Sequence, residues 1–288
     1  RTIRRYFLLN PDQARELEQC YWYCLGLAAQ RFGVVVHAGC LMSTHSHEVV
    51  TDARGVLPRF VQEFHRLLAL TTKSLRGWPG EVFDKRSTGQ HALVTPEAMI
   101  EALAYLISNP VEAGAVRYAN DWPGAHTLPR DIGQRVLNIR RPEHYFDPAN
   151  TNWPDVVQLR IEMPAALTIG YGMELAREQI AVRVKEREHR AWQESKRTDI
   201  AFLGERRVVR QAHTKRAGSE EAFGSLNPQF AAAGHVGAAA DMARQLRAFN
   251  AQYDQALAAW SAGRRDVYFP VGTWWMRVCH GARCGPAP

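Results

Sequence analysis

The segment VVVHAGCLMSTHSHEVVTD, residues 34–52, decides the fold that we predict for this chain. Residues 34–42 begin with three valines and continue with small or apolar side chains, which is typical of a buried strand. A second strand, residues 45–52, follows almost at once, and so short a connection indicates a β-hairpin. Because side chains alternate along a strand, His45 and His47 project from the same face, roughly 7 Å apart along the chain.

Helices are expected before and after this hairpin. Asn10, Pro11 and Gln13 predict a helix that starts at Asn10 and runs to residue 32, since Asn caps free amides, Pro fits the first turn and Gln completes a capping box. After the hairpin, Pro58 starts a helix that Gly77 ends. The other expected elements are a strand at residues 3–9, short extended pieces near 82–83 and 92–94, and a helix from residue 97 to about 108.

This order of elements is the split βαβ or ferredoxin-like pattern. We therefore expect an α+β domain over residues 1–130, with an antiparallel sheet and helices on one face. Residues 120–155 are rich in Pro, Asn, Asp and Trp, which indicates a boundary. Helices are expected at 173–194 and 239–262, so residues 131–288 are predicted to form a basic, mainly helical accessory region.

The positive charge of the chain is concentrated in one window. The 288 residues carry a formal net charge of +7, and residues 177–216 hold twelve Lys or Arg against six Asp or Glu. Such clustering suits a phosphate backbone, whereas the alternative is a solvated helix whose charges pair, as Glu186 and Arg190 could at a spacing of four. The nucleic-acid interpretation is favoured for residues 206–216, where the acids stop. The candidate DNA contacts are Lys85, Arg86, Arg206, Arg207, Arg210, Lys215 and Arg216.

Composition excludes several classes of protein. A chain that is 46% hydrophobic and 23% charged is neither disordered, collagen-like nor a disulfide miniprotein. Its five cysteines, an odd number, predict free thiols in a reducing compartment. No run of 18 apolar residues occurs, so no membrane partner is expected.

A second group of candidate residues lies on the helix that begins after Thr95. Its apolar side chains fall within a sector of about 120° at about 100° per residue, and Tyr105 falls on the opposite side. A tyrosine off the buried face does not fill the core of its own helix, and Asn109 shares its face at a spacing of four. If this face lies over His45 and His47, the site holds two imidazoles, an amide oxygen and a phenol. A divalent ion on the first three would polarise a phosphodiester that Tyr105 attacks.

These residues resemble a known family, the single-tyrosine HUH transposases and specifically the REP-associated tyrosine transposases. The resemblance rests on five segments of residues 1–127 and of the C-terminal end: LMSTHSHEVVTD, FVQEFHRLLA, YLISNPVEAGAV, DWPG and FPVGTWWMRVCHGARC. The combination of His-x-His and Tyr-x-x-x-Asn-Pro about sixty residues later matches in type, order and spacing.

The resemblance implies a function and a set of site residues. His45, His47 and Asn109 would bind Mg²⁺ or Mn²⁺, and Tyr105 would be the catalytic nucleophile. The expected activity is nicking and rejoining of single-stranded DNA beside palindromic hairpins, through a 5′-phosphotyrosine. No nucleotide cofactor is needed, in keeping with the absence of a GxxxxGK[ST] loop. The expected location is cytoplasmic and nucleoid-associated, as a monomer or homodimer.

Ser46 and Glu48 depart from the family pattern, which has apolar residues there. A buried Glu48 needs either an open sheet or a basic partner. Two alternatives therefore stay open, a catalytically inactive module that binds single-stranded nucleic acid, and an unrelated metal hydrolase that uses Glu48. The family's first strand also begins upstream of Arg1, so either the chain is incomplete or part of one strand is lacking. Four aromatic side chains could stack on unpaired bases, and the alternative is that they pack in the core or between domains: Trp122, Tyr268, Trp274 and Trp275.

Overall fold

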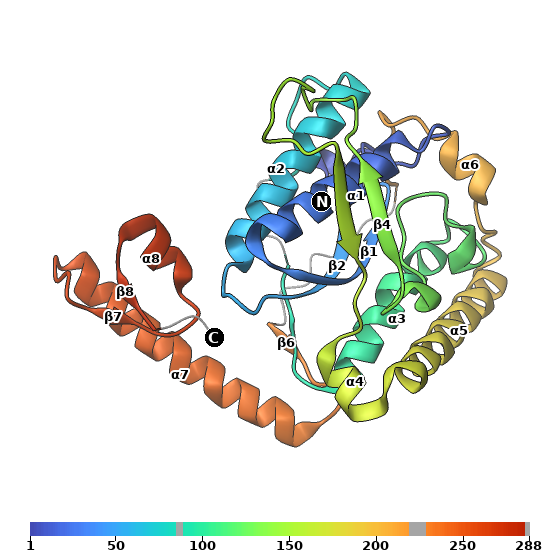
Figure 1. Cartoon of the computed structure of the whole chain (residues 1–288). Helices are drawn as coiled ribbons and strands as arrows, with labels where there is room; N and C mark the ends of the chain where they lie inside the picture. The colour runs from blue at the N-terminus through green and yellow to red at the C-terminus, as the bar shows by residue number, and fades with distance from the viewer. Residues whose placement is uncertain (85–88, 219–228, 286–288) are drawn as a thin grey trace.

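The computed structural model describes residues 1–84, 89–218 and 229–285, which form a mixed α+β structure (Figure 1). The α-helices of this part are α1 (Glu16–Phe32), α2 (Leu57–Arg76), α3 (Pro96–Glu112), α4 (Ala165–Tyr171), α5 (Met173–Thr198), α6 (Glu205–Val209), α7 (Val236–Ser261) and α8 (Trp274–His280). The strands are β1 (Val35–Leu41), β2 (Ser46–Thr51), β3 (Ala92–Leu93), β4 (Val136–Arg140), β5 (Val156–Arg160), β6 (Phe230–Ala231), β7 (Tyr268–Phe269) and β8 (Arg283–Cys284). Three short 3-10 helices are η1 (Ile3–Arg5), η2 (Ala119–Asp121) and η3 (Pro129–Asp131). The α+β class is confirmed, and the ferredoxin-like arrangement stays a prediction.

β1 and β2 form the antiparallel hairpin that the sequence predicted. Cys40 of β1 pairs with His47 of β2 in its register. The amide of Met42 donates to the carbonyl oxygen of His45 at 2.8 Å, which closes the turn. His45 and His47 therefore stand at the turn end of the hairpin.

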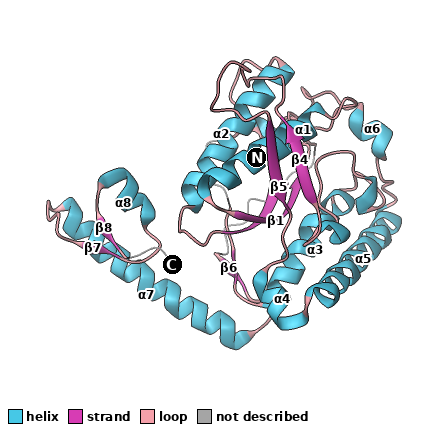
Figure 2. Ribbon diagram, in the orientation of Figure 1, coloured by secondary structure: helices cyan, strands magenta, loops and turns pink. Residues whose placement is uncertain are grey.

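The other edge of β1 pairs with residues that follow α3 in sequence. His126 forms a bridge to Cys40, and Ile161, directly after β5, forms a bridge to Val36. β4 and β5 pair with each other as a second antiparallel hairpin. Figure 2 shows these strands together in the larger part of the molecule, with helices around them. The segment 120–155 thus supplies His126 and β4, which lie beside β1 and β5.

Helices lie on both faces of the β1–β2 hairpin, so the expectation of helices on one face is wrong. Tyr21 of α1 bonds Glu48 at 3.0 Å, whereas Tyr105 of α3 contacts the ring of His47. Neighbouring residues of a strand point to opposite faces, so α1 and α3 lie on opposite sides. The physical reason is that β1 is buried along nearly its whole length, and a strand without a solvated face needs cover on both.

One hydrophobic core crosses residue 130. Its buried side chains run from Leu9 to Val208, and they include Val157 of β5 and Ile180 of α5. Packing therefore shows no break where the sequence indicated a boundary between residues 1–130 and 131–288. The Pro, Asn and Asp of that segment mark irregular backbone, which here is packed against the core.

The N-terminal segment differs from the prediction. Residues 3–9 contain η1 instead of a strand, and α1 begins at Glu16 instead of near Asn10. The carboxylate of Asp12 accepts from the first two amides of α1 at 3.0 Å and caps the helix. Asn10 serves another purpose, since its Nδ2 donates to the carbonyl oxygen of Val208 at 2.8 Å and fastens α6.

The C-terminal residues extend from the main body as an arm (Figure 1). β6 pairs with β3, and α7 then runs outward and carries β7, α8 and β8 at its far end. This end has a small core of its own around Ala256, Phe269 and Met276. None of the helices in the described ranges combines the length and the hydropathy needed to cross a membrane.

Candidate functional site

α3 presents Tyr105 to the histidine pair. Thr95 caps the helix, because its Oγ1 accepts from the amide of Ala98 at 3.1 Å, and Pro96 fills the first turn, as the sequence predicted. The stripe that includes Leu103 and Ile107 is buried, whereas Tyr105 is 41% exposed. The prediction that Tyr105 lies off the buried face is confirmed.

The structure brings together three of the four predicted chemical groups. The ring centroids of His45 and His47 are 4.8 Å apart, with the rings at 84° to each other. The centroid of Tyr105 lies 5.5 Å from that of His47, at 80°. Residues sixty positions apart in the chain thus form one cluster, in which a phenol lies beside two imidazoles.

Asn109 is the fourth predicted group. α3 continues through Pro110 to Glu112, so Asn109 is helical and one turn from Tyr105, as expected. Its side chain is buried, and within the described ranges no hydrogen bond links it to either histidine. Its predicted role as a metal ligand stays a prediction.

Both imidazoles are neutral at neutral pH. Burial lowers the pKa of His45 from 6.5 to about 3, with the neighbouring His47 as a second cause, and burial lowers that of His47 to about 4. Nδ1 of His45 lies 2.9 Å from Oγ1 of Thr44, which orients the ring. Nε2 of His47 is buried and, among the described residues, has no hydrogen-bond partner.

A neutral imidazole with a buried, unpartnered nitrogen fits a metal ligand. The residues present therefore fit a divalent ion, and nitrogen ligands favour Mn²⁺ over the harder Mg²⁺. Among the described residues, no three His, Cys, Asp or Glu side chains gather in one place, so the proposed ligand set consists of the two histidines and the amide oxygen of Asn109.

Glu48 lies on the other face of the sheet from the histidines. Its Oε1 accepts a hydrogen bond from the hydroxyl of Tyr21 at 3.0 Å, and burial raises the pKa of Glu48 to about 7. Gly39, the strand partner of Glu48, leaves room for this phenol, because a Cβ there would lie 2.5 Å from the Tyr21 oxygen. The hydroxyls of Tyr21 and Ser46 thus hydrogen-bond this carboxyl on the face of the sheet opposite His45 and His47. The structure gives no support to a metal hydrolase that uses Glu48.

The basic window divides at the end of α5. Within α5, arginines pair with acids three residues away, as in Arg177 with Glu174 and Arg197 with Glu194. These exposed pairs follow the solvated-helix interpretation, whereas Arg187 of the same helix pairs with Glu101 and Glu112 of α3. The cations after α5 differ, since four of them are exposed and make no ion pair with any described acid: Arg206, Arg207, Arg210 and Lys215.

The end of the basic window lies against the N-terminal segment. Arg216 donates to the hydroxyl of Tyr6 at 2.6 Å, and its guanidinium carbon lies 4.5 Å from the ring centroid of Tyr6. The ring of Trp78 is 5.0 Å from Tyr6 on centroids. In the same segment, the amide of Thr2 donates to the carbonyl oxygen of Thr44, next to His45, at 2.7 Å. The N-terminal segment therefore contacts both the end of the basic window, through Tyr6, and the residue next to His45, through Thr2.

The remaining candidates divide between packing and exposure. Trp122 is buried and donates to the carbonyl oxygen of Leu41 at 3.1 Å, so it packs in the core. Trp275 and Tyr268 are exposed on the C-terminal arm. Lys85 and Arg86, and the side chain of Trp274, lie outside the described residues.

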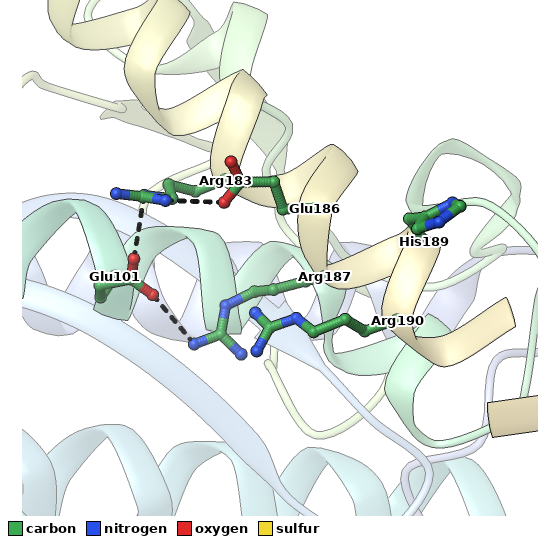
Figure 3. A pocket seen from close by; sticks show the side chains of 6 residues that line it. All are labelled: Glu101, Arg183, Glu186, Arg187, His189 and Arg190. Carbon is green, nitrogen blue, oxygen red and sulfur yellow. Dashed lines mark hydrogen bonds and ion pairs between the residues drawn. The ribbon is translucent and has the colours of Figure 1, made fainter. Parts of the chain in front are cut away.

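Sequence reasoning missed a group of residues between α3 and α5. A pocket of about 520 Å³ opens there, lined by Glu101, Arg183, Glu186, Arg187, His189 and Arg190. Figure 3 shows that Arg183 and Arg187 reach Glu101 from α5. In the sequence, these arginines were noted only as members of the basic window. Their acidic partners on α3 are more than seventy positions away, so no local sequence pattern indicates the contacts.

Comparison with protein-family models, with curated proteins and with solved structures found no match to this chain. A function for this chain is therefore inferred from the geometry of the site.

Proposed function

We propose that this chain is a single-tyrosine HUH enzyme that nicks and rejoins single-stranded DNA by transesterification, as REP-associated tyrosine transposases do. The observation that carries the proposal is the cluster of His45, His47 and Tyr105, with ring centroids 4.8 and 5.5 Å apart. Because Tyr105 lies beside the histidines of its own chain, the proposed reaction uses one subunit.

The metal would be held by the chain's own nitrogen and oxygen donors. His45 and His47, both neutral, would bind Mg²⁺ or Mn²⁺ together with the amide oxygen of Asn109, and the bound ion supplies polarisation of a non-bridging phosphodiester oxygen. Thr44 orients the ring of His45.

The covalent step belongs to Tyr105. A bond forms between its phenol oxygen and phosphorus, and the bond from phosphorus to the 3′ oxygen breaks with its electron pair on that oxygen. The phenol proton passes through solvent to the 3′ oxygen. The products are a 5′-phosphotyrosine and a free 3′-hydroxyl, and attack by a 3′-hydroxyl reverses the step without a nucleotide cofactor.

The exposed cations after α5 would bind the DNA backbone. They form no ion pair with a described acid, and the next cation in the chain, Arg216, lies over the ring of Tyr6, which contacts Trp78; cations beside aromatic rings suit unpaired nucleotides. We propose that residues 131–288 act as the DNA-holding part and that the protein works on DNA of the nucleoid.

A second candidate is a binding module that has lost its activity. The observation in its favour is that Ser46 and Glu48 stand where the family pattern has apolar residues, with Glu48 hydrogen-bonded to Tyr21. Such a module would hold single-stranded DNA on the same cations and form no covalent intermediate.

One assay separates the two candidates. The protein is incubated with Mn²⁺ or Mg²⁺ and a set of labelled oligonucleotides that carry a hairpin and a single-stranded flank, and a denaturation-resistant adduct is measured. We expect Tyr105→Phe to form no adduct, and Tyr118→Phe, a tyrosine of similar exposure, to form as much as the unchanged protein. Removal of the metal with EDTA should abolish the adduct, and added Mn²⁺ should restore it.

Two results would count against the proposal. DNA binding without adduct for every oligonucleotide would favour the binding module. Adduct formation that survives both His45→Ala and His47→Ala would exclude the histidine pair as the metal site.

A further inference from the structure

Arg187 joins α5 to the face of α3 that carries Tyr105. Its Nη2 lies 3.2 Å from Oε2 of Glu101, and its Nη1 lies 2.9 Å from Oε1 of Glu112. Glu101, Tyr105 and Glu112 occur at helical spacings of four and seven, so they share one face. The guanidinium carbon of Arg187 lies 5.5 Å from the centroid of Tyr105, between these carboxylates. One arginine thus bridges two carboxylates about three turns apart on α3 and lies over the tyrosine ring.

The ring of Tyr105 is contacted on two sides by neighbouring side chains. Arg187 contacts it from α5, and His47 contacts it edge-on from β2. The side chain of Arg187 is only 19% exposed, and a partly desolvated cation interacts with an aromatic ring more strongly than an exposed one. The hydroxyl of Tyr105 forms no hydrogen bond to another described residue. A nucleophile needs this combination of a fixed ring and an unblocked oxygen.

Arg187 also offsets negative charge beside the tyrosine. Without it, a phosphodiester that approaches Tyr105 would meet the carboxylates of Glu101 and Glu112. Glu101 would keep Arg183, at 3.1 Å, but among the described residues Glu112 would keep only the hydroxyl of Ser108, at 2.8 Å. Arg187 is therefore the cation on which the charge balance of this face depends.

We propose that Arg187 is a positioning residue for Tyr105, which fixes the ring beside the histidine pair and neutralises the flanking carboxylates. The inference rests on the proposed strand-cleavage function. It gives the accessory region a part in catalysis besides its proposed role in holding DNA.

The test compares Arg187→Ala with Arg183→Ala, a control in the same helix that also pairs with Glu101 but does not contact Tyr105. We expect Arg187→Ala to lower the single-turnover rate of adduct formation at saturating oligonucleotide on the order of tenfold or more. The Kd for the oligonucleotide, measured in a Tyr105→Phe background, should change far less. Arg187→Lys should recover part of the rate, since an ammonium holds one carboxylate but not the planar bridge to both. Arg183→Ala should keep the unchanged rate.

A second readout does not depend on activity. Protein labelled with 3-fluorotyrosine, with the Tyr105 resonance assigned through Tyr105→Phe, should show a ¹⁹F shift in Arg187→Ala that is absent in Arg183→Ala. The inference is overturned if the two variants agree in both rate and ¹⁹F spectrum. If the unchanged protein forms no adduct, the proposed function fails, and the ¹⁹F comparison still decides whether Arg187 orients the ring.

Discussion

His126 couples the sheet to α3 through a buried imidazole. Its backbone forms a bridge to Cys40 of β1, and its Nε2 lies 3.0 Å from the carbonyl oxygen of Ile107. Since a carbonyl oxygen only accepts, Nε2 carries the hydrogen. Burial lowers the pKa of His126 from 6.5 to about 4. The residue that supports the tyrosine helix is therefore neutral in the folded protein.

This lowered pKa predicts a loss of stability in acid. Between pH 6.5 and about 4 the unfolded chain binds a proton at His126 that the folded protein does not, so the free energy of unfolding decreases as the pH falls. His126 contributes about 3 kcal/mol to the pH dependence of the free energy of unfolding, and this stability is present above pH 6.5 and lost by about pH 4. Urea unfolding at a series of pH values measures the free energy of unfolding. Between pH 6.5 and about 4, this free energy should fall less steeply for His126→Gln than for the unchanged protein.

His280→Gln, at an exposed histidine, is the control for that substitution. Other buried histidines add to the acid response, so the comparison concerns the difference between curves. Equal slopes for His126→Gln and the unchanged protein would show that His126 is protonated alike in both states.

At the scale of elements, the sequence predicted those site residues whose positions follow from the spacing within one helix or one strand. Tyr105 and the pair His45 and His47 were found because the periods of helix and strand fix which side chains share a face. The partner of Glu48 was missed because Tyr21 reaches it through a tertiary contact that strand alternation does not specify. The ion pairs of Arg187 with Glu101 and Glu112 were missed for the same reason.

The start of α1 was also predicted wrongly, because the role of Asn10 depends on a tertiary contact. Asn10 looked like a helix cap, yet Asp12 caps α1 while Asn10 ties α6 to the body. Asn10→Ala should lower the free energy of unfolding by about 2 kcal/mol, because it removes two hydrogen bonds of a buried side chain, one donated to the carbonyl oxygen of Val208 and one accepted from the hydroxyl of Ser43. Asp12→Ala should lower it by about 1 kcal/mol, the ordinary value of a helix cap.

Chemical unfolding in urea measures both losses. Asn250→Ala, at an exposed position of α7, is the matched control and should not destabilise the protein. A smaller loss for Asn10→Ala than for Asp12→Ala would contradict the assignment of Asn10 as a tertiary anchor.

At the scale of the whole molecule, composition predicted a boundary that packing does not follow. Residues 120–155 contain few regular elements, but Phe146 and Trp153 pack beneath α1, and Arg31 lies 5.0 Å from the ring of Trp153. Truncation near residue 130 would expose the core that β5 and α5 cover, so it cannot isolate the contribution of the basic residues. Substitutions that leave the core intact are the better test.

The four exposed cations after α5 therefore define the last prediction. Arg206, Arg207, Arg210 and Lys215 are changed together to Gln, and binding of a single-stranded oligonucleotide is measured at several salt concentrations. Each phosphate contact contributes about 0.7 to the slope of log K against log salt, so the slope should become shallower by up to about 3. The control is a fourfold Gln variant at arginines that pair with an acid on their own helix or turn: Arg15, Arg177, Arg197 and Arg244. Both variants lose four positive charges, so a general effect of net charge would change the two slopes equally. A change confined to the first variant would instead locate the DNA backbone on the segment that links α5 to the N-terminal residues beside the histidine pair.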